Sequence, residues 1–217
     1  MKYQIKSLPI WSFKMSIQEF LKNWLIDKKN LNILEIGCGK NPSIDLNHIT
    51  QSTINVFHTV DFNHLKPITL FHKHFQMNFL EFYPELKYDL IIDGLCLHEQ
   101  NRNERIIFLD KIKSFLNTNG IFIGEHAISH KQMSFNEDNL LYDVESKYLY
   151  EQKNGAINIV KYIPDSLEIE LELGLHFQLN QFICSPTKKI ICNRTSNLSP
   201  LHSDPDHLFY VLENLKN

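Results

Sequence analysis

An acidic residue followed by two closely spaced glycines is the part of the chain best suited to chemistry. Glu35 ends an apolar run, and Gly37 and Gly39 follow on either side of Cys38, in a chain of 217 residues that has only seven glycines. Glycine lets the backbone turn sharply and lets a ligand approach main-chain N–H groups. A loop of this kind, leaving a buried strand and opening a helix, makes room for a nucleoside-bearing cofactor in α/β proteins.

A regular alternation of strands and helices is expected to position this loop. Apolar residues at helical spacing predict an amphipathic helix over residues 15–29. Strand-like runs follow at 31–37, 54–61, 71–76, 88–94 and 120–126. The last two contain almost continuous apolar segments, which are typical of parallel strands covered on both faces. A helical pattern from Ile106 to Leu116 lies between them and stops at the turn 117–120. This order predicts right-handed βαβ units in a doubly wound α/β sheet.

The last third of the chain follows a different pattern. A helix is predicted over 164–173, with Gly174 as its stop signal. Runs at 176–183 and 188–194 predict two strands of an antiparallel β-hairpin. Residues 200–217 are expected to contain a C-terminal helix.

The segment 127–163 interrupts the alternation. It is polar and rich in tyrosine and has no clean strand period. We expect an insertion on the substrate side of the sheet, which can be a lid or plain packing against the sheet. Because no repeat or linker is found, residues 1–217 are expected to form a single domain.

Composition narrows the function classes. The net charge is −3 and no basic face is evident, so broad nucleic-acid binding by charge is not indicated. No window approaches the roughly 18 apolar residues needed to cross a bilayer. The first residues lack the apolar core of a signal peptide. The four cysteines are widely spaced and apolar in context, which favours reduced thiols and a cytoplasmic location.

Several of these segments together resemble the class I S-adenosylmethionine-dependent methyltransferases over about residues 15–195. The matching motifs are 35–39, Asp61, 77–80, 88–99 and 115–123, in that order. The resemblance implies a seven-stranded, mostly parallel sheet that ends in an antiparallel hairpin, with helices on both faces. It also implies S-adenosylmethionine as the cofactor and methyl transfer to an acceptor as the activity.

The resemblance assigns roles to individual residues. Asp61 stands where the family binds the ribose diol, a task that suits a carboxylate because it accepts two hydrogen bonds in a fixed geometry. Further along the chain, the segment 77–80 stands where the family contacts the adenine of the cofactor, and the end of 88–99 stands under its methionine part. The implied cofactor-binding residues are Glu35, Gly37, Cys38, Gly39, Asp61, Phe62, Asn78, Phe79, Asp93 and Gly94. Two of them have plainer interpretations: Glu35 as a salt-bridged or capping carboxylate, and Asp61 as the start of a turn.

Two turns depart from the family pattern. Asn41, followed by Pro42, stands where the third glycine is usual, so we expect a stiffer loop and a displaced or shortened helix after it. Before the fifth strand, Thr118 and Asn119 replace a proline and a glycine. Asparagine tolerates left-handed backbone angles, so this turn can survive.

Three residues at strand ends are candidates for catalysis: His98, Glu125 and His126. Methyl transfer by in-line displacement mainly requires alignment of the two partners and exclusion of water. A nucleophile that carries a proton would also need a base, and these side chains could supply one. The alternative for His98, and for its neighbour Glu99, is a helix N-terminal turn.

The acceptor is only partly constrained. The Asp93-Gly94-Leu95-Cys96 segment does not fit the Asn/Asp-Pro-Pro-Tyr motif, which weakens the case for amino-methylation of bases or glutamine. A small molecule is favoured and a protein side chain remains open, while the oligomeric state is not predicted. One rival interpretation is an aminopropyltransferase, but no acidic site for a polyamine is evident. Another is a non-catalytic interaction module, but such a module would have no chemical need for Glu35 and Asp61. A nicotinamide-dependent dehydrogenase would need a longer glycine loop.

His72 and His74 invite a metal interpretation because alternating residues share one face of a strand. No third ligand with suitable spacing follows, so we expect a surface strand and no metal site.

Overall fold

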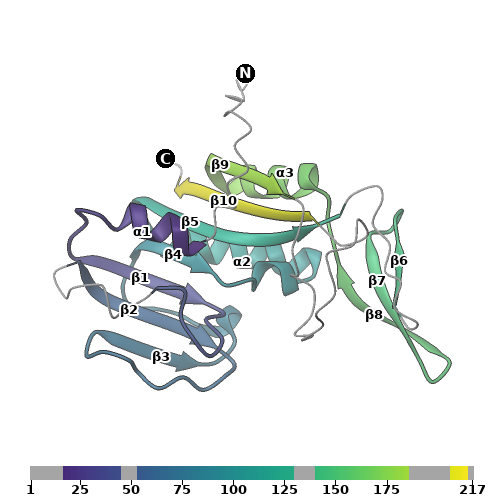
Figure 1. Cartoon of the computed structure of the whole chain (residues 1–217), viewed down its shortest axis with the longest axis horizontal. Helices are drawn as coiled ribbons and strands as arrows, with labels where there is room; N and C mark the ends of the chain where they lie inside the picture. Colours follow the sequence, from purple (N-terminus) through teal and green to yellow (C-terminus); the bar gives the residue numbers. More distant parts are fainter. Residues whose placement is uncertain (1–16, 45–52, 130–139, 186–205, 215–217) are drawn as a thin grey trace.

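The computed structural model describes residues 17–44, 53–129, 140–185 and 206–214, and they form an α/β fold around one seven-stranded sheet (Figure 1). The strand order is β3-β2-β1-β4-β5-β10-β9. The strands are β1 (Leu31–Ile36), β2 (Ile54–Asp61), β3 (His72–Gln76), β4 (Tyr88–Asp93), β5 (Leu116–Ile128), β9 (Phe177–Ser185) and β10 (Asp206–Asn214). β1 to β5 are parallel, whereas β10 is antiparallel to both β5 and β9. The predicted mostly parallel sheet with an antiparallel end is confirmed.

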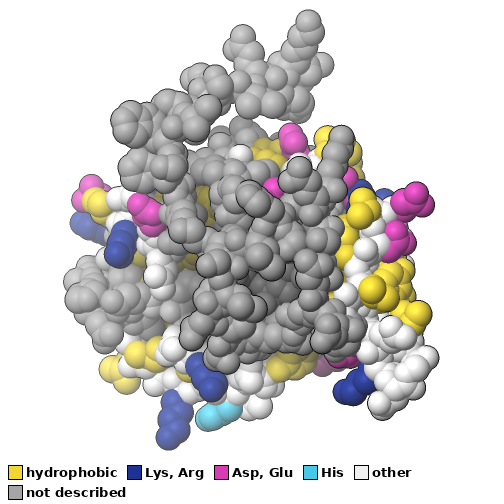
Figure 2. Space-filling view, turned by 45° about the vertical axis from the view of Figure 1, so that its right-hand side comes forward, with side chains coloured by type: hydrophobic (Ala, Val, Ile, Leu, Met, Phe, Trp, Pro, Cys, Tyr) yellow, Lys and Arg dark blue, Asp and Glu magenta, His cyan; other side chains and the backbone are white. Residues whose placement is uncertain are grey.

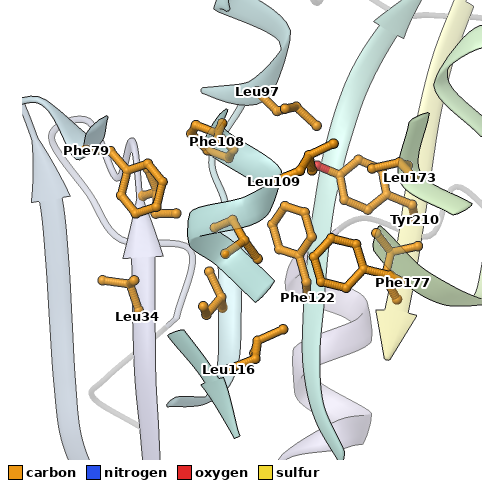
Figure 3. Packing of buried hydrophobic residues seen from close by; sticks show 14 of the residues in the cluster. Leu34, Phe79, Leu97, Phe108, Leu109, Leu116, Phe122, Leu173, Phe177 and Tyr210 are labelled. Atoms are coloured by element: carbon orange, nitrogen blue, oxygen red, sulfur yellow. The ribbon is translucent and has the colours of Figure 1, made fainter. Parts of the chain in front are cut away.

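Helices cover both faces of this sheet, as predicted. α1 (Ile17–Trp24) packs on one face, against apolar side chains such as Ile33 and Phe209. α2 (Arg102–Phe115) and α3 (Ser166–His176) pack on the other, against Phe122 and Tyr210 (Figure 3). Neighbouring strand residues therefore point into opposite cores, which explains the continuous apolar runs.

Two short 3₁₀ helices and the caps of α2 and α3 set the loops at the carboxyl edge of the sheet. η1 (Phe79–Glu81) follows β3, and η2 (Leu97–Glu99) follows β4. Asn101 begins α2 with a reciprocal capping box to Glu104, and Asp165 accepts a hydrogen bond from the backbone N–H of Glu168 at the start of α3. Each cap satisfies N–H groups that a helix leaves unpaired.

The predicted insertion forms a small antiparallel sheet of its own. It comprises β6 (Leu140–Asp143), β7 (Tyr148–Lys153) and β8 (Ala156–Tyr162), with β7 in the middle. Figure 1 shows this sheet beside the main one, on the side toward which the arrowheads of β1, β2 and β3 point. The insertion therefore lies at the carboxyl edge, where α/β sheets bind their ligands.

The prediction of a C-terminal helix over 200–217 is wrong for the residues that the structure describes. Asp206–Asn214 is the strand β10, which lies between β5 and β9. The first strand of the predicted hairpin is present as β9, which pairs with β10, while the second expected strand at 188–194 lies outside the described residues.

Three predicted boundaries also differ. The first helix is only Ile17–Trp24, and α3 continues past Gly174 to His176. β5 begins at Leu116, directly after α2, so no separate turn precedes the strand. Asn119 does take a left-handed conformation, with φ of 64°, as its position in place of a glycine predicts.

No helix among the described residues is long and apolar enough to span a bilayer. On the described part of the surface drawn in Figure 2, basic and acidic side chains are both present, and hydrophobic ones lie between them.

Candidate functional site

The glycine loop and the end of β2 meet directly. The backbone N–H of Gly39 donates to Oδ2 of Asp61 at 2.8 Å, and the N–H of Gly37 donates to the carbonyl of Val60 at 2.8 Å. Both glycines have left-handed φ angles, 73° at Gly37 and 59° at Gly39, which glycine adopts without strain. Oδ1 of Asp61 also accepts from the backbone and side-chain nitrogens of Asn63. The structure thus brings together the two motifs that the sequence separates by 22 residues.

Close packing against β4 explains why the first glycine is required. A Cβ on Gly37 would lie 2.3 Å from Sγ of Cys96 and 3.0 Å from the carbonyl oxygen of Gly94, whereas a Cβ on Gly39 would meet no atom within 4 Å. Gly94 in turn donates its N–H to the carbonyl of Ile36 at 2.7 Å. The loop after β1 and the loop after β4 are therefore in backbone contact.

Glu35 is buried and holds the far end of the loop. Its carboxylate accepts hydrogen bonds from the backbone N–H and the hydroxyl of Ser43, the shortest at 2.8 Å. Burial raises the pKa of Glu35 to about 7, although the bonds from Ser43 oppose the shift. Burial also raises the pKa of Cys38 to about 12, so its thiol stays protonated at neutral pH.

Asp93 ends β4 in a fully buried position. Its carboxylate accepts from the backbone N–H groups of Cys96 and Leu97 and from the hydroxyl of Tyr210, the last at 2.9 Å. Burial raises its pKa to about 7. Tyr210 reaches it from β10 across β5, where Gly124 makes room: a Cβ there would lie 2.3 Å from the tyrosine oxygen.

The three residues predicted to lie near the adenine differ in which of their atoms can contact a ligand. Phe62 follows Asp61 and is 73% exposed, so its ring is open to a ligand. Oδ1 of Asn78 accepts from the N–H of Leu80 and caps η1. The side chain of Phe79 is buried against Phe108, with ring centroids 4.7 Å apart, so only its backbone remains for a contact.

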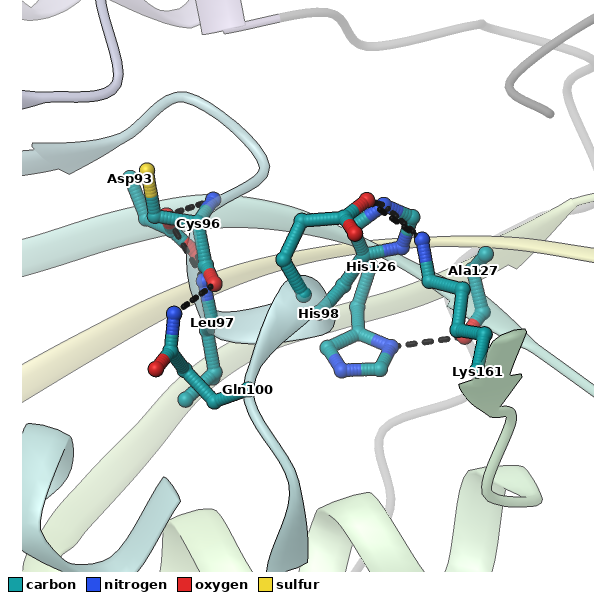
Figure 4. Close-up of polar contacts among 9 residues, drawn as sticks. Asp93, Cys96, Leu97, His98, Gln100, His126, Ala127 and Lys161 are labelled. Atoms are coloured by element: carbon teal, nitrogen blue, oxygen red, sulfur yellow. Dashed lines mark hydrogen bonds and ion pairs between the residues drawn. The ribbon is translucent and has the colours of Figure 1, made fainter. Parts of the chain in front are cut away.

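Two predicted catalytic residues come together beneath the inserted sheet. The rings of His98 and His126 are perpendicular, with centroids 5.6 Å apart, and both are buried (Figure 4). Nδ1 of His126 lies 2.6 Å from the carbonyl of Ala127. Nε2 of His98 lies 2.6 Å from Nζ of Lys161, which also donates to Glu99. Burial lowers the pKa of His98 and holds that of His126 well below its ordinary value, so both rings are neutral at pH 7.

The third candidate, Glu125, is separate from this pair. Its Oε1 accepts from the backbone N–H of Ile17 in α1 at 3.2 Å, a contact on the α1 side of the sheet. His126, the next residue of β5, points to the opposite side.

Sequence reasoning missed Arg105, Lys161 and Tyr210. Arg105 in α2 is fully buried and makes a two-pronged ion pair with Glu172 of α3, at 2.8 and 2.7 Å. Its guanidinium lies 5.1 Å from the ring centroid of Tyr162 in β8. No local signal distinguishes these residues from surface charges or core aromatics, because their contacts come from distant segments.

His72 and His74 serve β-sheet pairing. Nε2 of His72 and Nδ1 of His74 both lie 2.9 Å from the hydroxyl of Thr59 on β2. Their other nitrogens contact the backbones of Ile68 and Asn63. In the described part of the chain, no cluster of three or more His, Cys, Asp or Glu residues is arranged to hold a metal ion.

Solved structures similar to this chain include methyltransferases, although sequence identity is low. No family model matches the chain, and no curated protein matches it in sequence. The CcbJ methyltransferase of Streptomyces caelestis is 14% identical, with a TM-score of 0.59 over 92% of this chain and 89% of that one. A SAM-dependent methyltransferase of Methanosarcina mazei is 12% identical, with a TM-score of 0.59 over 94% of this chain and 100% of that one.

A third similar structure contains two bound small molecules. The 1,6-didemethyltoxoflavin-N1-methyltransferase of Burkholderia thailandensis, with bound 1,6-didemethyltoxoflavin and S-adenosylhomocysteine, is 13% identical. Its TM-score is 0.58 over 92% of this chain and 76% of that one. The chain therefore has the fold of the class I S-adenosylmethionine-dependent methyltransferases.

Proposed function

We propose that the protein binds S-adenosylmethionine at the carboxyl edge of β1, β2 and β4 and transfers its methyl group to a small-molecule acceptor. The observation that carries the proposal is the hydrogen bond between Gly39 and Asp61, which fixes a carboxylate beside a glycine loop at this edge. The fold supports the same assignment.

The proposed cofactor contacts follow from position and chemistry. Asp61 receives the ribose hydroxyls, Phe62 packs on the adenine, and Oδ1 of Asn78 faces its amino group. A carboxylate offers about four acceptor sites, and Asp61 already uses three, so the side chain of Asn63 must give way when ribose binds. Glu35 acts indirectly, because its carboxylate holds the loop through Ser43.

The end of β4 is proposed to lie under the methionine part. Gly94 brings its backbone against the loop at Gly37, and the buried Asp93 fixes the turn through Cys96. The methyl-bearing sulfonium supplies the reactivity, while the chain holds cofactor and acceptor in line and excludes water.

Of the three catalytic candidates, His126 is the best placed to receive the acceptor's hydrogen bond. Its Nδ1 donates to the carbonyl of Ala127, so in the neutral ring Nε2 carries a lone pair. Because its pKa is strongly lowered, His126 does not keep a proton at neutral pH. Its proposed roles are to align the nucleophile and to accept the proton of the nucleophile transiently.

A labelled-methyl assay tests this function. Protein is incubated with S-adenosylmethionine carrying a tritiated methyl group and with fractionated metabolites of the source cell. We expect label in a low-molecular-mass fraction, and loss of that signal in the Asp61→Ala variant. Label only in protein would contradict the small-molecule acceptor, and no transfer by cofactor-bound protein to any fraction would contradict the enzymatic assignment.

A further inference from the structure

Three buried polar atoms close to the predicted catalytic histidines lack a hydrogen-bond partner among the described residues. They are Nδ1 of His98, Nε2 of His126 and Nη1 of Arg105. Their side chains are among the least accessible polar groups in the protein, at 4%, 1% and 0% exposed. Buried polar groups are almost always hydrogen-bonded, so such a group calls for an explanation.

These atoms belong to one contiguous cluster. The rings of His98 and His126 lie against each other (Figure 4), and Nζ of Lys161 lies 2.6 Å from Nε2 of His98. Tyr162, the residue after Lys161, packs its ring against the Arg105 guanidinium. Residues from η2, α2, β5 and β8 therefore converge at the carboxyl edge of the sheet.

Arg105 is fixed in the orientation that leaves Nη1 unused. Its Nε and Nη2 atoms donate to the two carboxylate oxygens of Glu172, which sets the plane of the guanidinium. Nη1 then presents two N–H donors that the ion pair does not use. Arg105 therefore makes an ion pair with Glu172 and still has the N–H groups of Nη1 to donate to a ligand.

The histidines provide the complementary polarity. Nδ1 of His126 faces a carbonyl, so Nε2 is an acceptor in the neutral ring. His98 is more adaptable, because its Nε2 lies near both Lys161 Nζ and Glu99 Oε1. Its Nδ1 therefore donates or accepts according to which of these partners Nε2 serves.

The cluster has no excess positive charge for an anion. Arg105 is paired with Glu172, and Lys161 with Glu99. A carboxylate or phosphate would satisfy Arg105 but would set its oxygens against the lone pair of His126. A group that both accepts and donates one hydrogen bond satisfies the two together, and an uncharged hydroxyl does this.

From this juxtaposition we infer that Arg105 and His126 form a subsite for an uncharged hydroxyl group of the methyl acceptor, with His98 as its third partner. This subsite rests on the proposed function, because a hydroxyl compound bound there is a methyl acceptor only if the protein transfers a methyl group. It makes Arg105 a specificity residue: its Nη1 donates to the hydroxyl oxygen, and the hydroxyl proton points to Nε2 of His126. The acceptor class is then an alcohol or a phenol.

Nitrogen NMR of histidine-labelled protein tests the subsite without turnover. Phenol, anisole and benzoate are titrated in the presence of S-adenosylhomocysteine, whose own binding is measured first by calorimetry. Phenol should shift the Nε2 resonance of His126, whereas anisole, which lacks the donor, and benzoate, which carries charge, should not. No shift with phenol would mean that the cluster holds only water, and an equal or larger shift with benzoate would mean an anion site; either result overturns the inference.

Matched variants separate recognition from folding. Arg105→Lys keeps a cation for Glu172 but removes the forked donor, and we expect at least a fivefold loss of phenol affinity with S-adenosylhomocysteine affinity unchanged. Arg102→Lys, at an exposed position of the same helix, should behave as wild type. If Arg105→Lys does not fold, the uncharged pair Arg105→Gln with Glu172→Gln takes its place. Wild-type phenol affinity in a folded Arg105 variant overturns the inference, whereas phenol binding without cofactor binding overturns only the proposed function.

Discussion

The hydroxyl of Tyr210 donates a hydrogen bond to the buried carboxylate of Asp93, two strands away across Gly124. β5 lies between their strands, and Ile36, Asp93, Gly124 and Tyr210 occupy one row of the sheet at its carboxyl edge. The last described strand of the chain thereby supports the turn after β4, on which the proposed methionine subsite depends.

Removal of that hydrogen bond should destabilise the protein more at alkaline than at acidic pH. Tyr210→Phe should lower the free energy of unfolding by about 1–3 kcal/mol, because a buried carboxylate loses a donor. Asp93 has a pKa of about 7, so the loss should be larger at pH 8, where it is ionised, than at pH 5.5. Urea unfolding measures the difference. Tyr83→Phe, at a residue 78% exposed, is the control, and equal losses at both pH values would contradict the account.

The two glycines of the loop should respond differently to the same substitution. Gly37→Ala combines a left-handed φ with a Cβ 2.3 Å from Cys96 Sγ, and should cost about 2–5 kcal/mol. Gly39→Ala meets no neighbouring atom and should cost about 1–2 kcal/mol from the backbone alone. Thermal unfolding of the two variants side by side provides the test. A Gly39 variant as unstable as the Gly37 variant would show that the contact with β4 is unimportant.

Glu35 should make part of the stability pH-dependent. Its folded pKa of about 7 lies above its ordinary value of 4.5, so the folded state binds the proton more tightly than the unfolded state. That contribution is fully present below about pH 4.5 and is lost as the pH rises through 7. Relative to Glu35→Gln, the wild type should lose up to about 3 kcal/mol between these values. A constant difference across the window would mean that the carboxyl has an ordinary pKa.

The inserted sheet should depend on Lys161 for its attachment to η2. Lys161→Met removes the bonds to His98 and Glu99, and because Glu99 is largely exposed we expect a stability change within about 1 kcal/mol. Amide hydrogen exchange in β7 and β8 should nevertheless become faster, since these strands lose one of their attachments, the contact of Lys161 with η2. Lys153→Met, at an exposed end of β7, should leave exchange unchanged. Equal exchange in the two variants would exclude a fastening role for Lys161.

β1, β2, β4 and β5 could be predicted from the sequence because each contains a local apolar run, whereas β3 (HKHFQ) was found from its place in the alternation. The end of the chain could not be predicted, since residues 208–212 of β10 are apolar toward both faces. Leu208 and Tyr210 face one core while Phe209 and Val211 face the other. Such a run does not distinguish a strand from a buried helix by periodicity. Its place between β5 and β9 depends on pairing with distant segments.

In the candidate site, too, the local motifs could be predicted from the sequence and the contacts between distant segments could not. Glu35 and the glycines belong to one short local motif, and Asp61 ends the next strand-like run. The contacts of Arg105 and Lys161 instead connect α2 and η2 with α3 and β8. The inserted strands escaped prediction because β8 is exposed along most of its length, so no alternation marks it.

Calorimetric titration of the protein with S-adenosylhomocysteine tests the central claim most directly. We expect binding with a dissociation constant in the micromolar range, and a loss of about 1–3 kcal/mol in Asp61→Ala, from the missing bonds to the ribose and to Gly39. Asp110→Ala, which alters an exposed carboxylate of α2, should bind as the wild type does. Absence of binding by folded wild-type protein, or equal affinity in the Asp61 variant, would contradict the proposed cofactor site.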